Sequence, residues 1–297
     1  MEKYKILVAG AGGVGGYLTY ILEKSGFKPY LLARGENLEA IKRDGLKIIN
    51  NQKEEIIHPN VNDSFDESLK FDLIIIATKS YSLKELLKNI KKNIKESTII
   101  LPILNGIEIE KKIQKEIKAT VIKGCIYIIS HLIKPATIKK EGDVFKLCIE
   151  DKNLELINSI FKKLPIRVKI TKDIDLEIWR KFLFISPMAA LTSLYNIPMD
   201  QVYKRYPLLF EGMLKEIKEV ANSIKVPINN EDIKRTIKSA LNVKENTKTS
   251  MQLDLEKGKE SEFETLIEPL LEIASKNNIE LSIYPQIYKE LKEKYEL

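Results

Sequence analysis

The most constraining feature of the sequence is a glycine pattern near the N-terminus. Gly10, Gly12 and Gly15 have the spacing GxGxxG, directly after the strand-like run KILVA and directly before the helical pattern GGYLTYILEK. In this context the first glycine permits a tight turn, the second lets a pyrophosphate approach the backbone, and the third lets the helix pack close to the strand. The N–H groups at the helix start then face the phosphates. The pattern predicts a dinucleotide-binding loop made of Gly10, Ala11, Gly12, Gly13, Val14 and Gly15.

Short apolar runs alternate with amphipathic helical patterns through the first half of the chain. The apolar runs are KILVAG, KPYLLAR, FDLIIIATK, TIILPILNG and TVIKGCIYIIS, and two further strand-like runs, ATIKKEGDVFKLCIE and LPIRVKI, follow them. Strands separated by helices are typical of a parallel sheet that is covered on both faces. We therefore predict an α/β fold in which residues 1–170 form an N-terminal Rossmann domain with a doubly wound parallel sheet.

The pattern changes at about Thr171, after which apolar residues recur with a period of 3.6. Such segments include DIDLEIWRKFLFISPMAALTSLYN, PLLFEGMLKEIKEVANSI and EFETLIEPLLEIASKNN. Residues 171–297 are therefore predicted to form a C-terminal all-helical domain. A length of 297 residues favours two domains, and we expect them to pack closely around a cleft.

The composition predicts a globular protein without a membrane span. The longest apolar runs, such as LIIIAT and FLFISPMAAL, are shorter than the roughly 20 residues that a span needs. The N-terminal segment lacks the apolar region and cleavage site of a signal peptide, so we expect a cytoplasmic protein. Cys125 and Cys148 have no CxxC spacing and are predicted to be core residues.

The formal net charge of +7 does not by itself indicate a nucleic-acid partner. Lysines and glutamates alternate along the chain, as in KKNIKE and LKEKYE, which predicts a solvated surface that favours small anionic ligands. His58 and His131 are the only histidines and lie far apart in the sequence. We therefore expect neither a histidine-based metal site nor a catalytic histidine dyad.

The end of the second predicted strand indicates which dinucleotide binds. NAD enzymes place an acid there, on the ribose hydroxyls, but KPYLLARGEN has Arg34 at this point. A guanidinium can hold a 2′-phosphate through paired hydrogen bonds, which favours NADP. The alternative is that Arg34 is a surface residue and Glu36 binds the ribose of NAD.

Several spaced motifs together resemble the ketopantoate reductases (2-dehydropantoate 2-reductases), within the superfamily of 6-phosphogluconate-dehydrogenase-like proteins. The motifs are GAGGVGG, LLAR, ATKSY, LNG, WRKF and SMQLDLEKGKESEFE, in the family's order and spacing. The resemblance extends over nearly the whole chain. It implies a Rossmann domain and a helical domain that enclose NADPH and a 2-oxo acid, whose ketone is reduced.

Two residues at predicted strand ends match cofactor-binding positions. Lys79 follows the strand FDLIIIAT, where ligands of doubly wound sheets gather, and can hold a phosphate or a carboxylate. The alternative for Lys79 is a solvated loop lysine. Asn105 follows the strand TIILPIL, and the resemblance implies that its amide contacts both the substrate and the cofactor.

A ketone reduction needs a proton donor, and with both histidines poorly placed a lysine in the cleft is the natural candidate. The resemblance assigns this role to Lys181 in the W-x-K motif, although the alternative is a lysine that snorkels at a helix end. It further assigns the partner of Lys181, in the C-terminal helix, to Glu262, with Glu260 and Glu264 as competitors, and a substrate contact to Ser250.

The sequence departs from the family on the helix that carries the lysine. Ketopantoate reductases have asparagines four and eight residues after it, which places three polar side chains on one helix face. Here those positions are Ile185 and Ala189. Ser186 and Thr192 lie close by, and with a helix kink expected at Pro187 they are candidates to restore a polar contact.

The leading hypothesis is NADPH-dependent reduction of ketopantoate to pantoate, in pantothenate and coenzyme A synthesis. The substrate would contact Asn105, Lys181 and Ser250. One alternative is a reductase of a less polar oxo acid or imine, and another is a regulatory protein that binds NADP without catalysis. No nucleic-acid or membrane partner is expected, and a homodimer is possible.

Overall fold

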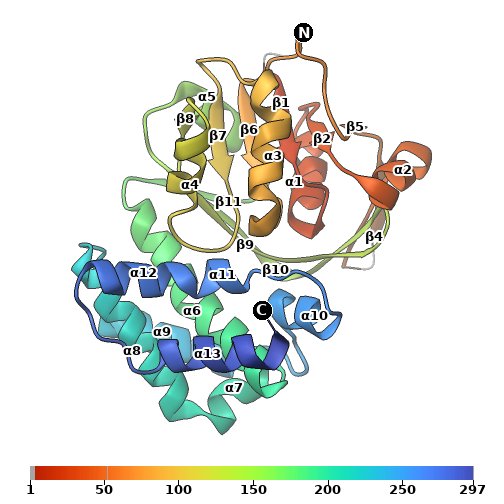
Figure 1. The fold of residues 1–297 in the computed structure, drawn as a ribbon. Helices are drawn as coiled ribbons and strands as arrows, with labels where there is room; N and C mark the ends of the chain where they lie inside the picture. Colours follow the sequence, from red (N-terminus) through yellow and green to blue (C-terminus); the bar gives the residue numbers. More distant parts are fainter. Residues whose placement is uncertain (1–3, 52, 297) are drawn as a thin grey trace. The chain divides into compact units, whose positions relative to one another are not determined.

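The chain forms two compact units (Figure 1) in the computed structural model, which describes residues 4–51 and 53–296. The first unit comprises Met1–Leu104 and Ile109–Ile174, and the second comprises Asn105–Glu108 and Asp175–Leu297. The division along the chain therefore falls at residues 174 and 175, beside the predicted division at 170 and 171. In addition, the short segment that begins at Asn105 groups with the helical unit, because Ile107 packs in the core of that unit.

A six-stranded parallel sheet forms the centre of the first unit. The order is β5-β2-β1-β6-β7-β8, which is the Rossmann order 3-2-1-4-5-6 when the six strands are counted along the chain. The strands are β1 (Ile6–Ala9), β2 (Tyr30–Leu32), β5 (Asn60–Asn62), β6 (Leu73–Ile76), β7 (Ile99–Pro102) and β8 (Thr120–Val121). The predicted doubly wound parallel sheet is confirmed.

Helices cover both faces of this sheet because successive strand residues point to opposite sides. Val8 and Ile75 pack on one face with α1 (Gly13–Lys24) and α2 (Gly35–Asp44). Leu7 and Ile74 pack on the other face with α3 (Leu83–Ile90) and α4 (Ile109–Glu116). Each central strand is therefore apolar at every position, as expected for a parallel sheet buried on two sides.

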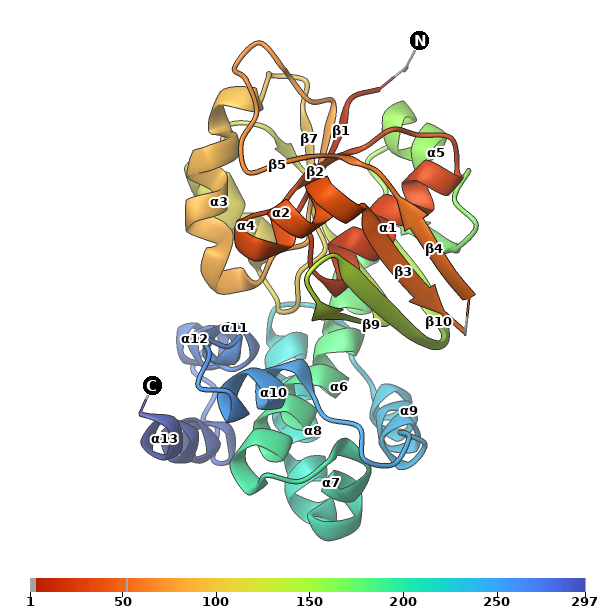
Figure 2. The ribbon, with the colours of Figure 1, turned by 90° about the vertical axis from the view of Figure 1, so that its right-hand side faces the viewer.

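A second, five-stranded sheet completes the first unit. It contains β3 (Leu46–Asn50), β4 (Lys53–Ile57), β9 (Gly124–Lys134), β10 (Thr137–Glu150) and β11 (Arg167–Thr171), and α5 (Glu155–Phe161) connects the last two strands. Figure 2 shows β3, β4, β9 and β10 side by side. The run TVIKGCIYIIS is therefore not one strand: Thr120–Val121 joins the parallel sheet and Gly124–Lys134 joins the second sheet. Cys125 and Cys148 lie opposite one another on β9 and β10 and are buried, as predicted.

The second unit is helical in its described residues, which confirms the predicted all-helical character. Its helices are α6 (Ile174–Tyr195), α7 (Met199–Arg205), α8 (Pro207–Ser223), α9 (Asn230–Leu241), α10 (Ser250–Glu256), α11 (Phe263–Leu266), α12 (Glu268–Lys276) and α13 (Tyr284–Tyr295). The apolar helix α6 continues through Pro187 and contributes Leu183, Met188 and Leu191 to the core. The carboxylate of Glu216 accepts hydrogen bonds from the backbone at the start of α13, which satisfies N–H groups that the helix leaves open.

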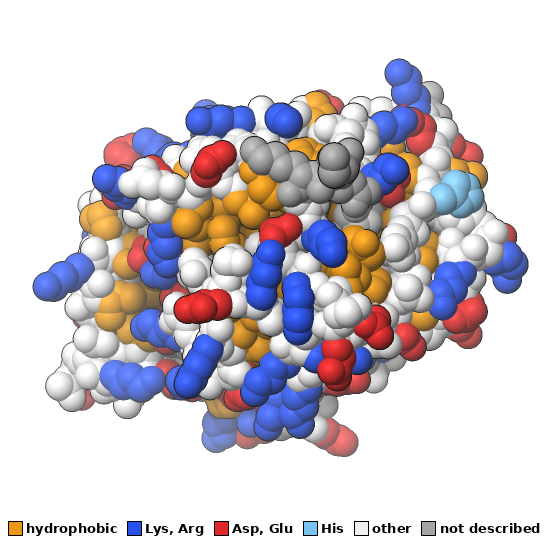
Figure 3. All heavy atoms as spheres, turned by 90° about the horizontal axis from the view of Figure 1, so that it is seen from above, with side chains coloured by type: hydrophobic (Ala, Val, Ile, Leu, Met, Phe, Trp, Pro, Cys, Tyr) orange, Lys and Arg blue, Asp and Glu red, His pale blue; other side chains and the backbone are white. Residues whose placement is uncertain are grey.

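The apolar length of the helices in the described part of the chain can be compared with the thickness of a bilayer. No single helix there is long and apolar enough to cross a bilayer, and α6 with α7 passes such a test only as a pair bent by 86°. On the face drawn in Figure 3, basic and acidic side chains are interspersed.

Candidate active site

The glycine loop has the geometry that its spacing predicts. Gly10 follows β1 with φ of 118°, a value that disfavours any residue with a side chain. A Cβ at Gly15 would overlap the carbonyl oxygen of Gly10, so the third glycine is required by the close approach of α1 to the strand. A Cβ at Gly12, in contrast, would meet no protein atom within 4 Å. This open side of the loop fits the approach of a pyrophosphate at the start of α1.

Two side chains that sequence analysis missed hold the carbonyl groups of the glycine loop. Asn37 donates from its side-chain amide to the oxygen of Ala11 at 3.0 Å and accepts from the backbone N–H of Ala136 at 2.8 Å. Ser130 donates from its hydroxyl to the oxygen of Gly13 at 2.8 Å. Because Ala136 and Ser130 belong to the β9–β10 hairpin, the second sheet fixes the conformation of the loop.

Thr78, which the sequence analysis also missed, lies beside the glycine loop at the same edge of the sheet. It follows β6, and its backbone nitrogen would lie 2.9 Å from a Cβ at Gly10, which follows the neighbouring strand β1. The strand order reverses between β1 and β6, where ligands of doubly wound sheets bind. The Thr78 hydroxyl is buried and has no hydrogen-bond partner within the described residues. Such a group costs about 1–3 kcal/mol, which a bound ligand atom can recover.

The other predicted cofactor residues of the first unit lie at strand ends. Arg34 is the N-cap residue of α2, and its guanidinium donates to Glu85 at 2.9 Å and to Ser82 at 3.0 Å. Glu36, the alternative ribose-binding residue, is exposed in the first turn of α2. Lys79 is half-buried and directly precedes the 3-10 turn Ser80–Ser82, so it is not the fully solvated lysine of the alternative interpretation.

A hydrogen-bonded chain joins three predicted site residues within the second unit. The Nζ of Lys181 donates to Oδ1 of Asn105 at 2.8 Å, and Nδ2 of Asn105 donates to Oε2 of Glu262 at 3.2 Å. Lys181 and Glu262 are 9% and 2% exposed. A buried ammonium and a buried carboxylate are thus connected through one amide. The amide orients the lysine, and the carboxylate compensates its charge.

Local structure explains how each member of this chain is held. Lys181 lies on α6 between Trp179 and Phe182, whose rings pack edge to face with centroids 5.8 Å apart. Asn105 lies in the loop after β7, where Gly106 takes a φ of 110° that lets the chain turn. Glu262 is the N-cap residue of α11 rather than a residue within a helix.

The structure distinguishes Glu262 from the other acids of its motif. Glu260 and Glu264 are both exposed, whereas Glu262 is buried and bonded to Asn105. Ser250, the predicted substrate contact, is the exposed first residue of α10. Within the described residues it is not a member of the Lys181 hydrogen-bond chain.

The hydroxyl groups near the apolar positions of α6 are engaged inside the fold. Ser186 bonds the carbonyl of Leu266 at 2.7 Å and the hydroxyl of Tyr284 at 2.8 Å, and burial raises the pKa of Tyr284, so that this phenol stays protonated. The expectation that Ser186 restores a polar substrate contact is therefore wrong, because its hydrogen bonds are used internally. Ala189 is buried and Ile185 is partly buried.

Thr192 does not restore the missing polarity either. Its hydroxyl is fully buried and bonds the carbonyls of Met188 and Ala189, at 2.8 and 3.2 Å, and the hydroxyl of Thr249 at 2.9 Å. Ser186 and Thr192 therefore do not supply the polarity of the asparagines that the family has on this helix.

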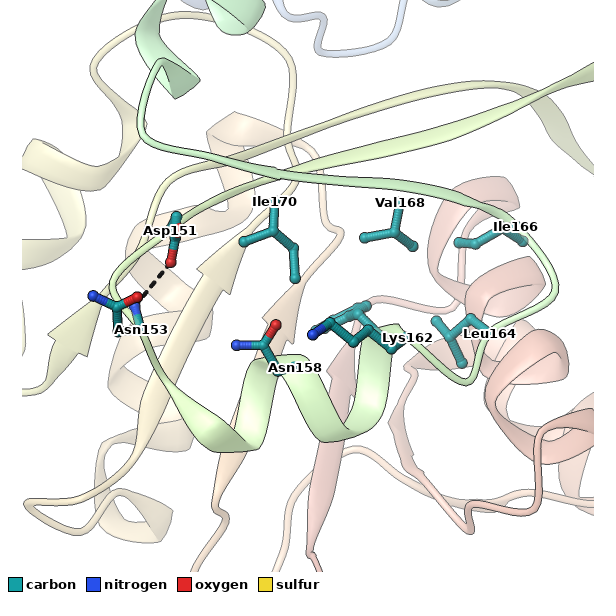
Figure 4. Close-up of a pocket in the computed structure, with 9 residues that line it drawn as sticks. Asp151, Asn153, Asn158, Lys162, Leu164, Ile166, Val168 and Ile170 are labelled. Atoms are coloured by element: carbon teal, nitrogen blue, oxygen red, sulfur yellow. Dashed lines mark hydrogen bonds between the residues drawn. The ribbon is translucent and has the colours of Figure 1, made fainter.

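A surface hollow of the first unit lies between α5 and β11 (Figure 4). Figure 4 shows Ile170, Val168 and Ile166 on the strand side and Asn158 and Lys162 on the helix side. None of the site residues described above lines this hollow. We therefore define the candidate site by its chemical groups rather than by the shape of the surface.

A Rossmann-type unit with an open glycine loop, combined with a helical unit that holds a Lys–Asn–Glu chain, defines a dinucleotide-dependent oxidoreductase. Sequence comparison identifies which one: the family model Ketopantoate reductase PanE/ApbA matches residues 6–149, and the model of its C-terminal region matches residues 173–295. The chain belongs to the ketopantoate reductase family.

Individual relatives are similar along almost the whole chain. The uncharacterized oxidoreductase YkpB of Bacillus subtilis is 27% identical over 298 residues, with 97% of both chains covered. The 2-dehydropantoate 2-reductase of Mesorhizobium japonicum is 28% identical, with 91% of both chains covered. All of the relatives named here therefore share both units.

Solved structures of other proteins share the fold of this chain. The PanE/ApbA family ketopantoate reductase of Ralstonia eutropha superposes with a TM-score of 0.89 at 20% identity, covering 99% of this chain and 100% of that chain. D-mandelate dehydrogenase with NADH and anilino(oxo)acetate superposes with a TM-score of 0.89 at 22% identity, covering 98% of both chains. The fold of these two solved structures is therefore the fold of this chain.

Proposed function

We propose that this protein reduces a 2-oxo acid with NADPH, and that its substrate is ketopantoate, which becomes pantoate. The observation that carries the proposal is the chain from Lys181 through Asn105 to Glu262, which holds a buried proton donor in one orientation. The relatives named 2-dehydropantoate 2-reductase support the choice of substrate. In this role the protein acts in the cytoplasm, in pantothenate and coenzyme A synthesis, as a monomer or homodimer with a small-molecule substrate.

The cofactor is proposed to bind the first unit. Residues 10–15 would hold its pyrophosphate, Arg34 and Lys79 would contact its phosphates, and Asn105 would contact both cofactor and substrate. The open side of Gly12 and the buried hydroxyl of Thr78 support this fit. When bound, NADPH supplies the hydride that the ketone carbon accepts.

The residues of the second unit supply the proton. As the ketone carbon becomes tetrahedral, negative charge develops on its oxygen, and the Lys181 ammonium donates a proton to that oxygen to give the alcohol. Asn105 keeps Nζ in place by accepting one of its three hydrogens. Glu262 compensates the buried positive charge, and Lys181 then regains its proton from water. Ser250 is proposed to contact the substrate carboxylate or hydroxyl.

A second candidate function is the reduction of a less polar oxo acid or imine. Ile185 and Ala189 replace the family's amides, and Ser186 is bonded inside the fold, so a hydroxyl-bearing substrate has fewer partners on α6. Without such partners, a pocket prefers a hydroxyl-bearing substrate over its analogue without the hydroxyl by a ratio that is smaller by orders of magnitude. The structural similarity to D-mandelate dehydrogenase, solved with NADH and anilino(oxo)acetate, supports this second candidate.

Steady-state oxidation of NADPH distinguishes these functions. The purified chain is assayed with ketopantoate and with 2-oxo acids that have apolar side chains, beside Lys181→Ala and the control Lys172→Ala, which changes an exposed lysine. We expect the highest kcat/KM with ketopantoate, loss of turnover by at least about 100-fold in Lys181→Ala, and unchanged NADPH affinity.

Other outcomes identify the alternatives. If an apolar 2-oxo acid gives a higher kcat/KM than ketopantoate, that acid and not ketopantoate is the preferred substrate. Tight NADPH binding without turnover on any oxo acid identifies a non-catalytic regulatory protein. If Lys181→Ala loses NADPH affinity and turnover together, while Lys172→Ala loses neither, Lys181 is a structural residue.

A further inference from the structure

Arg34, which we propose to receive the 2′-phosphate of NADP, has an acidic partner in this structure. Its Nη1 donates to Oε2 of Glu85 at 2.9 Å, and its Nη2 donates to the Ser82 hydroxyl at 3.0 Å. Both partners follow β6, in the 3-10 turn Ser80–Ser82 and the first turn of α3. The end of β2 therefore presents a guanidinium and a carboxylate together, although the chain has no acid at the usual position on β2 itself.

The two groups favour different forms of the cofactor. A carboxylate can only accept hydrogen bonds, so Glu85 suits the 2′-hydroxyl of NAD and repels the 2′-phosphate of NADP. A guanidinium can only donate, so Arg34 suits the phosphate. The Ser82 hydroxyl accepts from Arg34 and keeps its own hydrogen for donation, so it suits either form.

The exposure of the ion pair indicates that it does not block NADP. The Arg34 and Glu85 side chains are 67% and 75% exposed. Exposed ion pairs contribute little to stability and are screened by salt, so a phosphate can displace the carboxylate from the guanidinium. Glu85 stays attached to α3 after this displacement, and its charge remains close to a phosphate that carries up to two negative charges.

We propose that Glu85 is a specificity-determining residue that lowers the preference of this protein for NADPH over NADH, so that the protein binds both. Arg34 attracts the phosphate, Glu85 opposes it and accepts a hydrogen bond from the ribose of NADH, and the balance between the two residues sets the ratio of affinities. This inference rests on the proposed function, because it concerns the cofactor of that reaction.

Binding titrations on the full chain test the inference without any substrate. Dissociation constants for NADPH and NADH are measured by nucleotide fluorescence at low ionic strength. For Glu85→Gln, we expect tighter binding of NADPH and weaker or equal binding of NADH, with the affinity ratio moved toward NADPH by about 5- to 10-fold. Arg34→Gln should move the ratio in the opposite direction. The shift should shrink at high salt, because screening weakens charge interactions in exposed sites.

A matched control separates a local effect from a general change of charge. Glu36→Gln removes the same charge from an exposed acid two residues after Arg34, and it should leave the affinity ratio unchanged. Thermal melting should be unaltered in Glu85→Gln and Glu36→Gln, because both side chains are exposed. Any change in the ratio is then a change in recognition.

Three results would overturn the inference, and one of them also overturns the function. If Glu85→Gln leaves the ratio unchanged while both nucleotides bind, Glu85 does not set specificity but the proposed function stands. If Glu36→Gln moves the ratio instead, Glu36 is the residue that reads the ribose. If the unaltered chain binds neither NADPH nor NADH, both the inference and the proposed function fail.

Discussion

The ammonium of Lys181 donates to the amide oxygen of Asn105 at 2.8 Å, although the two residues are 76 positions apart in the chain. The same amide donates to Glu262, which lies 157 positions after Asn105 in the chain. An amide that accepts from a cation on one side and donates to an anion on the other has only one favourable orientation. Asn105 therefore positions the lysine and connects it to the charge that compensates it.

Replacing Asn105 by Ala should remove this orientation while leaving Lys181 in the protein. We expect kcat for 2-oxo acid reduction to fall about 10- to 100-fold, because a proton donor loses efficiency when it is no longer held in place. Stopped-flow measurement of NADPH oxidation at saturating substrate checks this. Asn242→Ala, at an exposed position after α9, is the control. An unchanged kcat in Asn105→Ala would exclude a positioning role.

Removal of the buried Thr78 hydroxyl should not destabilise the free protein, but it should weaken the binding of NADPH. Thr78→Val keeps the shape but removes a hydroxyl that has no partner within the described residues. We expect the melting temperature without nucleotide to stay equal or rise, and the dissociation constant for NADPH to increase about 5- to 10-fold. Thr78→Ser should retain the affinity. A lower melting temperature with unchanged affinity would make the hydroxyl structural.

Ser186 should matter for stability and not for substrate recognition. Ser186→Ala removes hydrogen bonds to Leu266 and Tyr284 in a fully buried site, so the free energy of unfolding should fall by about 1–3 kcal/mol. Urea titration measures this change, with the exposed helix residue Ser239→Ala as control. The KM for the preferred oxo acid should not change, and a large increase in KM would restore Ser186 as a substrate contact.

Asp200 should make the second unit sensitive to acid. Burial alone would raise the pKa of Asp200, but hydrogen bonds from the Gln201 side chain and the Asn246 N–H outweigh it and hold the pKa below the ordinary 3.8. A lowered folded pKa means that the carboxylate stabilises the fold above pH 3.8, and that this contribution is lost as the pH falls through the folded value.

The measurement for Asp200 is a set of urea titrations at several pH values. As the pH falls from 5 to 2, a range on both sides of the ordinary pKa of 3.8, the unaltered chain should lose more stability than Asp200→Asn. The exposed control Asp173→Asn should follow the unaltered chain. Parallel curves for Asp200→Asn and the unaltered chain would show that Asp200 contributes nothing to the acid response.

Local patterns identified several features correctly. The glycine spacing located the turn between β1 and α1, because only glycine tolerates the φ of Gly10 and the overlap at Gly15. The apolar runs located the parallel strands, since strands buried on both faces are apolar throughout. The period of 3.6 residues located the helices of the second unit. Glu262 was assigned to a helix, but it is the N-cap residue of α11, because helix ends depend on capping contacts more than on periodicity.

Other features depend on neighbours that the local pattern does not contain. The run TVIKGCIYIIS contributes to two sheets, because the partners of Val121 and Cys125 are strands from different parts of the chain. Arg34 is bonded by Ser82, in the 3-10 turn after β6, and by Glu85, in α3. The carbonyls of the glycine loop are bonded by Asn37 and Ser130. Each contact joins residues that are distant in sequence.

The sequence by itself determined the class of fold, the glycine turn between β1 and α1 and the family of this protein, because backbone preferences and hydrophobic periodicity act over a few residues. Only the tertiary structure decided which acid meets Asn105, that Ser186 and Thr192 are used inside the fold, and that Arg34 has Glu85 as its partner. These depend on where folding brings distant side chains, since hydrogen bonds and ion pairs act only within a few ångströms.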